Sequence, residues 1–431
     1  MNDAIVIGVD IGTSGVRAVA MDGRLRIVAH AAVPMAAPQR AGSGVSQSPS
    51  VWSAAVDECL LQLHAAVDPL RVRAIAVDGT SGTLLLTDAQ GLPIADALMY
   101  NDARGVQAAQ RIAEVAPPES AAHGASSALA RLLYLQSLHA TAGVAHALHQ
   151  VDWITGRWLG RFGDSDENNA LKTGYDPVAR AWPAWFDALE VQRDWLPRVH
   201  APGTSLGAVS PAAARLHGWR TDTQVVAGTT DGVAAFLATG ACEVGDAVTS
   251  LGTTLVVKLL CERPLFAPEY GIYSHRLGNQ WLAGGASNAG GAALLTQFTA
   301  SRMAELSTHV KPDEPTGLDY YPLPGPGERF PVNDPTLVAR IEPRPEDDVR
   351  FFQGLLEGLA GIERLAYQRL AELGAPPSRS VRTVGGGAKN AAYTRIRQRA
   401  LGVAMPESLH TEAACGAAML ARGAVGLGDA A

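Results

Sequence analysis

Cysteine is scarce in this chain, with four residues among 431. They stand at Cys59, Cys242, Cys261 and Cys415, and no two of them form a CxxC pair. This spacing disfavours both a structural zinc site and a disulfide framework. It predicts a cytoplasmic protein, because thiols stay reduced in that compartment.

Long apolar segments are lacking as well. The longest uncharged stretch, residues 277–301, is rich in Gly, Ala, Asn and Ser. Such a stretch is too polar to span a bilayer, and it predicts a glycine turn that opens a helix. The first residues also lack the basic and apolar segments of a secretory signal. We therefore expect no membrane partner.

An excess of positive charge is missing too. The chain has 35 Lys and Arg against 42 Asp and Glu, which gives a net charge of −7. This balance argues against a nucleic acid or an anionic membrane surface as the main partner. Hydrophobic residues make up 47% of the chain, as in globular proteins, and the length allows two or three domains.

The most informative segment is the first one, residues 5–22. An apolar run ends at a carboxylate, a Gly and hydroxyl turn follows, and a second extended run reaches Asp22-Gly23. Walker and Rossmann loops lead into a helix, whereas this turn lies between two predicted strands. Its small residues let backbone N–H groups approach phosphate oxygens. The residues in question are Asp10, Gly12, Thr13, Ser14 and Arg17.

Each residue of this hairpin has an assigned chemistry and an ordinary alternative. Gly12, Thr13 and Ser14 suit phosphate oxygens, and Arg17 would reach one from the second strand. Asp10 suits a hydrated Mg²⁺ ion. The alternative is a plain glycine hairpin, in which Asp10 bonds local backbone and Arg17 is solvated.

A weaker copy of this hairpin lies at residues 245–258. It places Ser250, Gly252, Thr253 and Thr254 between two further apolar runs. Either hairpin alone is explained by turn chemistry. The pair predicts two halves that face one phosphate chain, with Gly252 and Thr253 among the phosphate contacts.

Strand-like and helix-like patterns alternate along the chain, which predicts an α/β protein. We place the domain boundary near residue 222, which gives domains 1–222 and 223–431. Predicted helices cover residues 52–66, 127–139, 145–160, 232–239, 347–373, 391–401 and 412–424, and predicted strands include 74–78, 83–87, 224–227 and 381–384. Residues 311–348 are rich in proline and predict a long surface excursion.

Asp231 is the candidate general base. It follows a predicted buried strand and a Gly-Thr-Thr turn, and it heads a predicted helix. A carboxylate there would accept a proton from an alcohol as the alcohol attacks a phosphate. The alternative is a helix N-cap, where Asp satisfies free backbone N–H groups.

The segment 385–390 follows the strand at 381–384 and opens with three consecutive glycines, more than a simple turn requires. Its backbone would allow close approach of a flat or charged ligand, and the alternative is a strand-to-helix turn. Gly290 lies in a similar but weaker segment, where small residues also allow close packing of helices. The arginines of the following helix, Arg395, Arg397 and Arg399, are expected on its surface.

Polar residues of the first half are candidates for reading a polyol. They fall in the segments 78–81, 101–104 and 164–169, and the contacts we assign are Asp10, Thr80, Ser81, Asn101, Asp102 and Asp231. Hydroxyl recognition relies on such directional donors and acceptors. For any single residue, turn chemistry is the simpler explanation.

Together these motifs resemble the FGGY carbohydrate kinase family of the actin-like ATPase superfamily. The matching segments, in chain order, are residues 10–17, 100–104, 227–232, 250–254, 385–390 and 412–418. The resemblance implies two ribonuclease H-like domains with a cleft between them, with the sugar mainly on the first and ATP on the second. It implies Asp231 as base, Asp10 and Asp231 as Mg²⁺ sites largely through water, and Gly386, Gly387 and Asn390 at the nucleoside.

Two departures from the family pattern bear on the substrate. Arg131 stands where the family's helix motif usually has Lys, and residues 78–83 replace the Met-His pair of xylulose kinases. These features are similar to compact pentulose kinases, so D-ribulose is our first expectation and D-xylulose the second. Another sugar or polyol, a non-catalytic actin-like ATP switch, and a kinase with a decayed sugar site stay open. So do a monomer and a homodimer.

Overall fold

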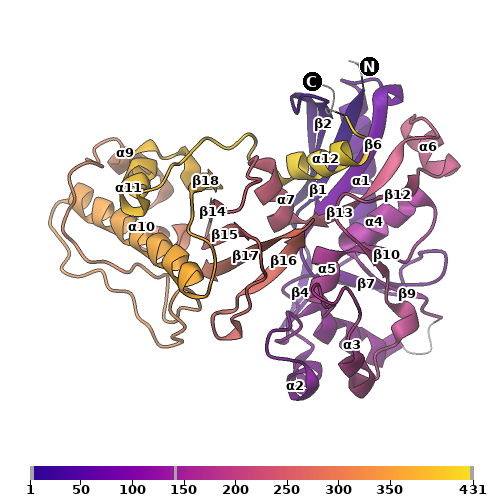
Figure 1. The fold of residues 1–431 in the computed structure, drawn as a ribbon, viewed down its shortest axis with the longest axis horizontal. Helices are drawn as coiled ribbons and strands as arrows, with labels where there is room; N and C mark the ends of the chain where they lie inside the picture. Colours follow the sequence, from indigo (N-terminus) through magenta and orange to yellow (C-terminus); the bar gives the residue numbers. More distant parts are fainter. Residues whose placement is uncertain (1–3, 140–142, 428–431) are drawn as a thin grey trace. The chain divides into compact units, whose positions relative to one another are not determined.

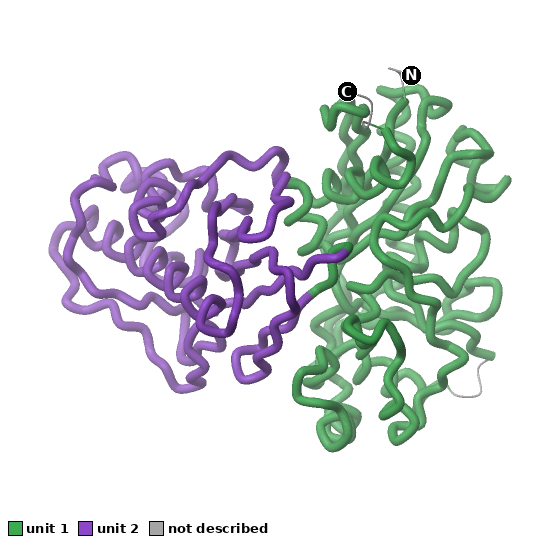
Figure 2. Tube along the Cα trace, in the orientation of Figure 1, with its two compact units in different colours: residues 1–238, 275–278, 412–431 green, residues 239–274, 279–411 purple. Residues whose placement is uncertain are grey.

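A computed structural model describes residues 4–139 and 143–427, which group into two units. Unit 1 contains the described residues up to Ala238, with 275–278 and the residues from Glu412 on. Unit 2 contains residues 239–274 and 279–411. The two units are distinguished by colour in Figure 2.

Unit 1 is built on a six-stranded mixed sheet with the order β12-β13-β6-β1-β2-β3. Strands β1, β6 and β13 run parallel, while β2, β3 and β12 are antiparallel to their neighbours. These strands span Ser205–Ala208, Gln224–Thr230, Val72–Gly79, Ile5–Ile11, Gly15–Asp22 and Ile27–Pro34 in sheet order. The first predicted hairpin is confirmed as β1 and β2, with Gly12 to Ser14 between them.

Alternating side chains of β1 face two different layers, as the period of a strand requires. Ile5, Ile7, Val9 and Ile11 pack against helices α1 (Pro49–His64) and α4 (Gln150–Leu159). Val6 packs on the other face against the alanine-rich α12 (Ala413–Ala424). A Cβ on Gly8 would lie 1.9 Å from the Ala414 carbonyl oxygen, so α12 needs a glycine in β1.

A second sheet of unit 1 has the order β4-β5-β8-β7-β9, and β10 pairs with β11. The remaining elements of unit 1 are β4 (Gln39–Ala41), β5 (Gly44–Gln47), β7 (Leu84–Thr87), β8 (Ala97–Leu98), α2 (Val106–Val115), α3 (Ala128–His139), β9 (His146–His149), β10 (Asp164–Asp166), α5 (Glu167–Lys172), β11 (Arg198–His200), α6 (Pro211–His217) and α7 (Asp231–Ala238). Most of them are labelled in Figure 1.

Unit 2 contains the sheet order β17-β15-β14-β18, in which β14 and β18 are parallel. These strands span Gln280–Ser287, Leu255–Cys261, Asp246–Leu251 and Ser380–Val384, and β16 (Tyr273–Leu277) precedes β17. Its helices are α8 (Gly291–Leu295), α9 (Ala300–Ser307), α10 (Asp348–Glu372) and α11 (Ala391–Leu401). Phe351, Leu355 and Leu359 of α10 are buried in the core that covers this sheet. The second predicted hairpin is confirmed as β14 and β15.

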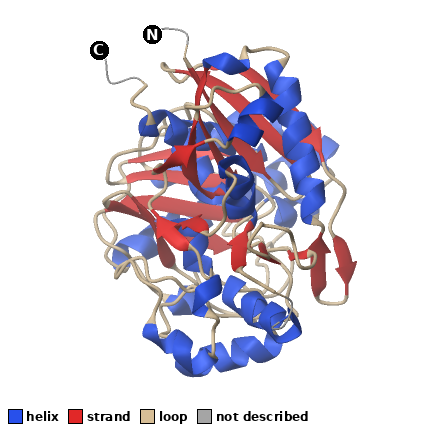
Figure 3. Cartoon of the chain, turned by 90° about the vertical axis from the view of Figure 1, so that its right-hand side faces the viewer, coloured by secondary structure: helices blue, strands red, loops and turns tan. Residues whose placement is uncertain are grey.

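Helices and strands alternate through the chain as the sequence predicts. Figure 3 distinguishes the two kinds of element by colour. Two segments differ from the prediction. Residues 145–160 are not one helix, because β9 pairs with β7 and α4 begins only after it, where His149 N–H donates to Asp152 Oδ2 at 2.9 Å. Residues 280–287 form strand β17, and a Cβ on Gly285 would lie 2.6 Å from the Phe330 ring. Gly285 admits an aromatic ring, and the helix expected in residues 277–301 opens later, at Gly290 and Gly291, as α8.

The compact units also divide elsewhere than residue 222. Strand β13 belongs to unit 1, because it pairs in parallel with β6, and α7 follows it. Helix α12, from the far end of the chain, joins the same unit by packing on β1. Among the helices of residues 4–139 and 143–427, none is both long and apolar enough to cross a membrane.

Candidate active site

Three carboxylates gather at the carboxyl ends of the parallel strands of unit 1. Asp10 of β1 lies directly opposite Asp78 of β6, so both side chains project from the same face. Thr229 of β13 lies opposite Asp78, and Asp231 begins α7 two residues later. Carboxyl ends of parallel strands are the usual place for ligands in α/β sheets.

Burial and mutual repulsion define the electrostatics of this cluster. Burial raises the pKa of Asp10, the charge of Asp231 adds to the effect, and Arg17 opposes it. Arg17 Nη1 lies 3.3 Å from Asp10 Oδ2. Asp78 is fully buried, and burial followed by the charges of Asp10 and Asp231 raises the pKa of its carboxyl well above the usual range. Asp231 Oδ1 accepts a hydrogen bond from Gly232 N at 2.6 Å.

The first hairpin turn is held by its own backbone. Gly12 N–H donates to Gly15 O at 3.0 Å, and Ser14 O accepts from Met35 N at 2.9 Å. Thr13 is half-buried and Ser14 is exposed, so these bonds fix the loop while its tip faces outward. The turn therefore has the form that the sequence predicts for a phosphate contact, next to Asp10.

Of the predicted sugar contacts, Ser81 and Asn101 have side-chain atoms that lack protein partners. Ser81 Oγ and Asn101 Oδ1 are shielded from solvent and make no hydrogen bond within the described part of the chain. Thr80 differs, because its hydroxyl bonds Thr83 Oγ1 at 2.7 Å and Gln150 Oε1 at 3.1 Å. Its side chain therefore supports the loop from inside.

Asp102 is also engaged within the protein. It is fully buried, and its carboxylate accepts from Val45 N at 2.6 Å and from Arg104 Nε at 2.9 Å. Arg104 Nη2 lies 2.7 Å from the same oxygen. In this geometry Asp102 orients Arg104 and β5, and a sugar contact by its carboxylate stays a prediction.

A cation site made by protein side chains alone is not present in the part of the chain that the structure describes. No three His, Cys, Asp or Glu side chains among residues 4–139 and 143–427 are arranged to hold a metal ion. Mg²⁺ usually keeps several waters and uses one or two carboxylates with phosphate oxygens. The neighbouring carboxylates of Asp10 and Asp231 fit that donor set.

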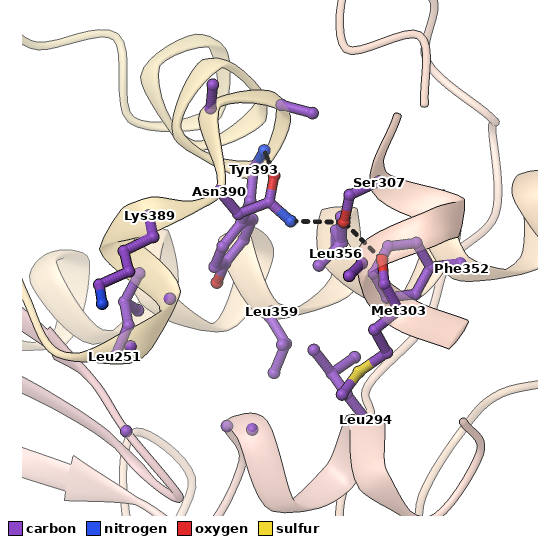
Figure 4. A pocket seen from close by; sticks show the side chains of 18 of the residues that line it. Leu251, Leu294, Met303, Ser307, Phe352, Leu356, Leu359, Lys389, Asn390 and Tyr393 are labelled. Carbon is purple, nitrogen blue, oxygen red and sulfur yellow. Dashed lines mark hydrogen bonds between the residues drawn. The ribbon is translucent and has the colours of Figure 1, made fainter. Parts of the chain in front are cut away.

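Unit 2 contains a pocket of about 540 Å³. Its walls are the β14–β15 turn, the start of α8, helices α9 and α10, and the turn before α11 (Figure 4). Five predicted nucleotide contacts line it: Gly252, Gly290, Gly386, Gly387 and Asn390. Thr253 lies next to this lining, exposed at the hairpin tip, and its carbonyl accepts from Ala292 N at 3.0 Å. The volume and the largely apolar wall suit a small-molecule ligand.

The glycines of this pocket differ in the space beside their α-carbons. A Cβ on Gly290 would lie 2.7 Å from Thr253 O, so that glycine lets α8 approach the second hairpin. Gly385 has φ +88°, and a Cβ there would lie 2.7 Å from Leu251 O. Gly386 has open space instead, with nothing within 4 Å of an added Cβ. Among these three glycines, Gly386 is thus the one whose backbone is open to the pocket.

Asn390 is a helix cap as well as a pocket residue. Its Oδ1 accepts from Tyr393 N at 3.0 Å at the start of α11, and its Nδ2 donates to Ser307 Oγ at 2.9 Å (Figure 4). The expectation that Arg397 lies on the surface of α11 is wrong. Its side chain is fully buried, whereas Arg395 and Arg399 are exposed or nearly so.

Sequence reasoning missed most of the apolar pocket wall. Leu294, Met303, Phe352, Leu356 and Leu359 come from α8, α9 and α10. The periodicity of α10 predicts that it has a buried face, but apolar periodicity does not distinguish a core contact from a pocket wall. Asp78 was noted only as the first residue of a polar segment, and its pairing with Asp10 depends on strand register.

Family comparison agrees with this geometry. Residues 5–238 match the N-terminal domain of the FGGY family of carbohydrate kinases, and residues 247–425 match the C-terminal domain. A relative named xylulose kinase from Escherichia coli strain K12 is 26% identical over 411 residues, which is 90% of this chain and 83% of that protein.

Solved structures agree on the fold. A xylulose kinase from Lactobacillus acidophilus has a TM-score of 0.86 at 18% identity, covering 99% of this chain and 90% of that one. A gluconate kinase from the same organism gives the same four values, 0.86, 18%, 99% and 90%. Because differently named kinases match equally, this likeness shows the two-domain α/β fold and leaves the sugar open. The chain belongs to the FGGY family of carbohydrate kinases, and it is an ATP-dependent sugar phosphotransferase.

Proposed function

We propose that this kinase transfers the γ-phosphate of ATP to the terminal hydroxyl of a ketopentose, with Asp231 as the general base. The observation that carries the proposal is the position of Asp231 at the β13–α7 junction, beside the buried Asp10. A base at the carboxyl edge of the sheet accepts the hydroxyl proton as the oxygen attacks phosphorus. The hydrogen bond from Gly232 N orients the Asp231 carboxylate for that step.

The phosphate contacts follow from the two hairpins. We assign Gly12, Thr13 and Ser14 to one end of the phosphate chain, and Gly252 with Thr253 to the other. Arg17 follows the first turn on β2, and it also holds Asp10. Phosphoryl transfer needs this kind of positioning and charge neutralisation more than covalent catalysis.

The adenosine is assigned to the pocket of unit 2. The backbone at Gly386 and Gly387 lies against the ligand, and Leu359 and Phe352 supply apolar wall. Asp10 and Asp231 are the residues that would hold hydrated Mg²⁺, which neutralises charge on the transferring phosphate when bound. The Asp10 carboxylate is already oriented for this by Arg17.

The sugar is a ketopentose, for which two candidates remain. The name of the Escherichia coli relative supports D-xylulose. The segment 78–83, which lacks the Met-His pair of xylulose kinases, supports D-ribulose. Polar groups aimed at individual hydroxyls distinguish such isomers strongly, so turnover with each separates the candidates.

The test of the proposed base is Asp231→Asn. The release of ADP from ATP with D-xylulose, D-ribulose, L-ribulose, ribitol or glycerol as the phosphate acceptor should fall about a hundredfold or more. ATP binding, measured by calorimetry, should stay close to wild type. Asp222→Asn, at an exposed aspartate paired with Arg220, is the matched control and should keep full turnover. Activity of Asp231→Asn within roughly tenfold of wild type would exclude this base.

A further inference from the structure

We propose that Arg131 is a positioning residue for the sugar site. It joins the loops that carry Ser81 and Asn101, and the inference rests on the proposed function of those two residues as sugar contacts. Arg131 lies on α3 and is 1% exposed. It is the residue that stands where the family pattern usually has Lys.

The guanidinium of Arg131 binds four backbone carbonyls, which come from three segments of the chain. Nη2 donates to Gly82 O at 2.6 Å, and Nη1 donates to Tyr100 O at 2.8 Å. Nη1 also lies within hydrogen-bond distance of Ser126 O at 2.5 Å and of Asp102 O at 3.3 Å. One side chain therefore connects three stretches of chain that are otherwise separate in sequence.

These carbonyls flank the two predicted sugar contacts. Gly82 O follows Ser81, while Tyr100 O and Asp102 O stand on either side of Asn101. Ser81 Oγ and Asn101 Oδ1 are shielded from solvent and lack partners within the described residues. Buried polar atoms normally find a partner, so two such atoms on clamped backbone indicate a place for an external donor or acceptor. Sugar hydroxyls supply both.

A second link joins the same loops. Thr83 Oγ1 accepts from Tyr100 N at 3.1 Å, and it also bonds Thr80 Oγ1 at 2.7 Å. Gln150 Oε1 in turn accepts from Thr80 N at 3.2 Å. The loop after β6 and the segment around Asn101 are therefore tied by hydroxyls as well as by Arg131.

The clamp uses carbonyl dipoles and not an ion pair. Arg131 contacts only the backbone carbonyl of Asp102. The carboxylate of Asp102 is bound to Arg104 instead. Four carbonyls arranged around one planar group suit the fixed donor fork of Arg, whereas a Lys ammonium has three donors at one point. Replacement by Lys should keep part of the clamp, and replacement by Met should leave all four carbonyls without this donor.

The experiment compares Arg131→Lys and Arg131→Met by steady-state kinetics with D-xylulose and D-ribulose. The kcat/KM for the better sugar should fall about tenfold in Arg131→Lys and by a hundredfold or more in Arg131→Met, because small displacements of positioning groups have effects of this size. The KM for ATP should stay within twofold of wild type in both. A loss confined to the sugar separates positioning from general destabilisation.

Thr83→Val provides a second variant that removes no charge. It breaks the link to Tyr100 N, so kcat/KM for the sugar should fall again, and Thr83→Ser should restore it. Arg422→Lys is the matched control, because Arg422 Nε also donates to a carbonyl, Gly23 O at 2.9 Å, at the amino end of β1. Its kinetics should match wild type.

The outcomes separate the inference from the proposed function. If wild type phosphorylates a ketopentose but Arg131→Met and Thr83→Val keep kcat/KM for it within threefold, the positioning role is overturned and the proposed function stands. If the KM for ATP changes as much as that for the sugar, the role is also overturned. If wild type turns over no sugar, the proposed function fails, and the positioning role fails with it.

Discussion

Arg397 on α11 and Glu363 on α10 form a fully buried ion pair beneath the strand that leads into the glycine turn of the pocket. Arg397 Nε lies 2.6 Å from Glu363 Oε2, and its Nη2 lies 2.7 Å from Oε1. Arg397 Nη1 also donates to Thr383 Oγ1 of β18 at 2.7 Å, two residues before Gly385. The pair thus connects α10 and α11, two helices that line the pocket of unit 2, with strand β18, which leads into the glycine turn of that pocket.

Removing one partner of this pair should be costly. Arg397→Met leaves Glu363 buried without its cation, and such changes cost about 3 to 5 kcal/mol of unfolding free energy. Urea denaturation measures the loss. Arg395 lies two residues earlier on α11, where its side chain is exposed and pairs with Asp313. The change Arg395→Met should therefore cost at most about 1 kcal/mol of unfolding free energy. Equal midpoints for the two variants would show that the buried pair contributes nothing specific.

Two neighbouring glycines of the pocket should respond differently to alanine. Gly385→Ala places a Cβ 2.7 Å from Leu251 O at a φ of +88°, so we expect a stability loss of about 1 kcal/mol or more. Gly386→Ala meets nothing within 4 Å, so its melting temperature should stay near wild type. If Gly386 faces the nucleotide, its variant should raise the KM for ATP severalfold. Thermal melts and ATP titration of the kinase reaction measure both effects.

Substitutions of Asn390 test whether its side chain only caps helix α11 or also contacts the bound nucleotide. Asn390→Asp keeps the oxygen that accepts from Tyr393 N but loses the donor to Ser307 Oγ. Asn390→Ala loses both and should cost about 1 kcal/mol, the usual cost of losing an N-cap. Stability should therefore rank wild type, then Asp, then Ala in urea denaturation. Because Asn390→Asp keeps the cap acceptor, a raised KM for ATP in this variant would identify the amide as a nucleoside contact, whereas an unchanged KM would mean that Asn390 acts only as the helix cap.

Local patterns predicted the elements of the fold because they depend on neighbouring residues. The helix at 391–401 and the strand at 381–384 follow from periodicity and flanking glycines, and both are confirmed. The error at residues 145–160 has a different origin. Strand β9 forms because it pairs with β7, some sixty residues earlier, and apolar periodicity within one segment does not record such a partner.

The same limit applies to the site. Asp10 was recognised because it ends an apolar run before a glycine and hydroxyl turn, and Asp231 because it follows such a turn and heads a predicted helix. Asp78 has the same local pattern as Asp10, but its importance depends on register with Asp10 across a parallel pair. The sequence around Arg131 does not distinguish it from any other arginine on a helix. Its role depends on four carbonyls that come from three separate loops. Residues that act through long-range contacts are therefore the ones that sequence patterns miss.

His149 should give the protein an acid-sensitive stability. It is 2% exposed, and burial followed by the charge of Arg131 lowers its pKa to about 3. The unfolded chain binds a proton below about pH 6.5 while the folded ring stays neutral. The stability from this neutral ring is therefore complete above pH 6.5 and is lost as pH falls toward 3, by about 2 kcal/mol at pH 5.

His149→Gln tests that expectation, because Gln retains a polar group near Thr173 Oγ1, which lies 2.9 Å from the His149 ring nitrogen. The drop in unfolding free energy between pH 7.5 and pH 5, measured by urea denaturation, should be about 2 kcal/mol smaller in the variant than in wild type. His30→Gln, at an exposed histidine of β3, should retain the wild-type drop. Parallel pH curves for wild type and His149→Gln would mean that the folded protein takes up the proton at His149 as readily as the unfolded chain, which its burial argues against.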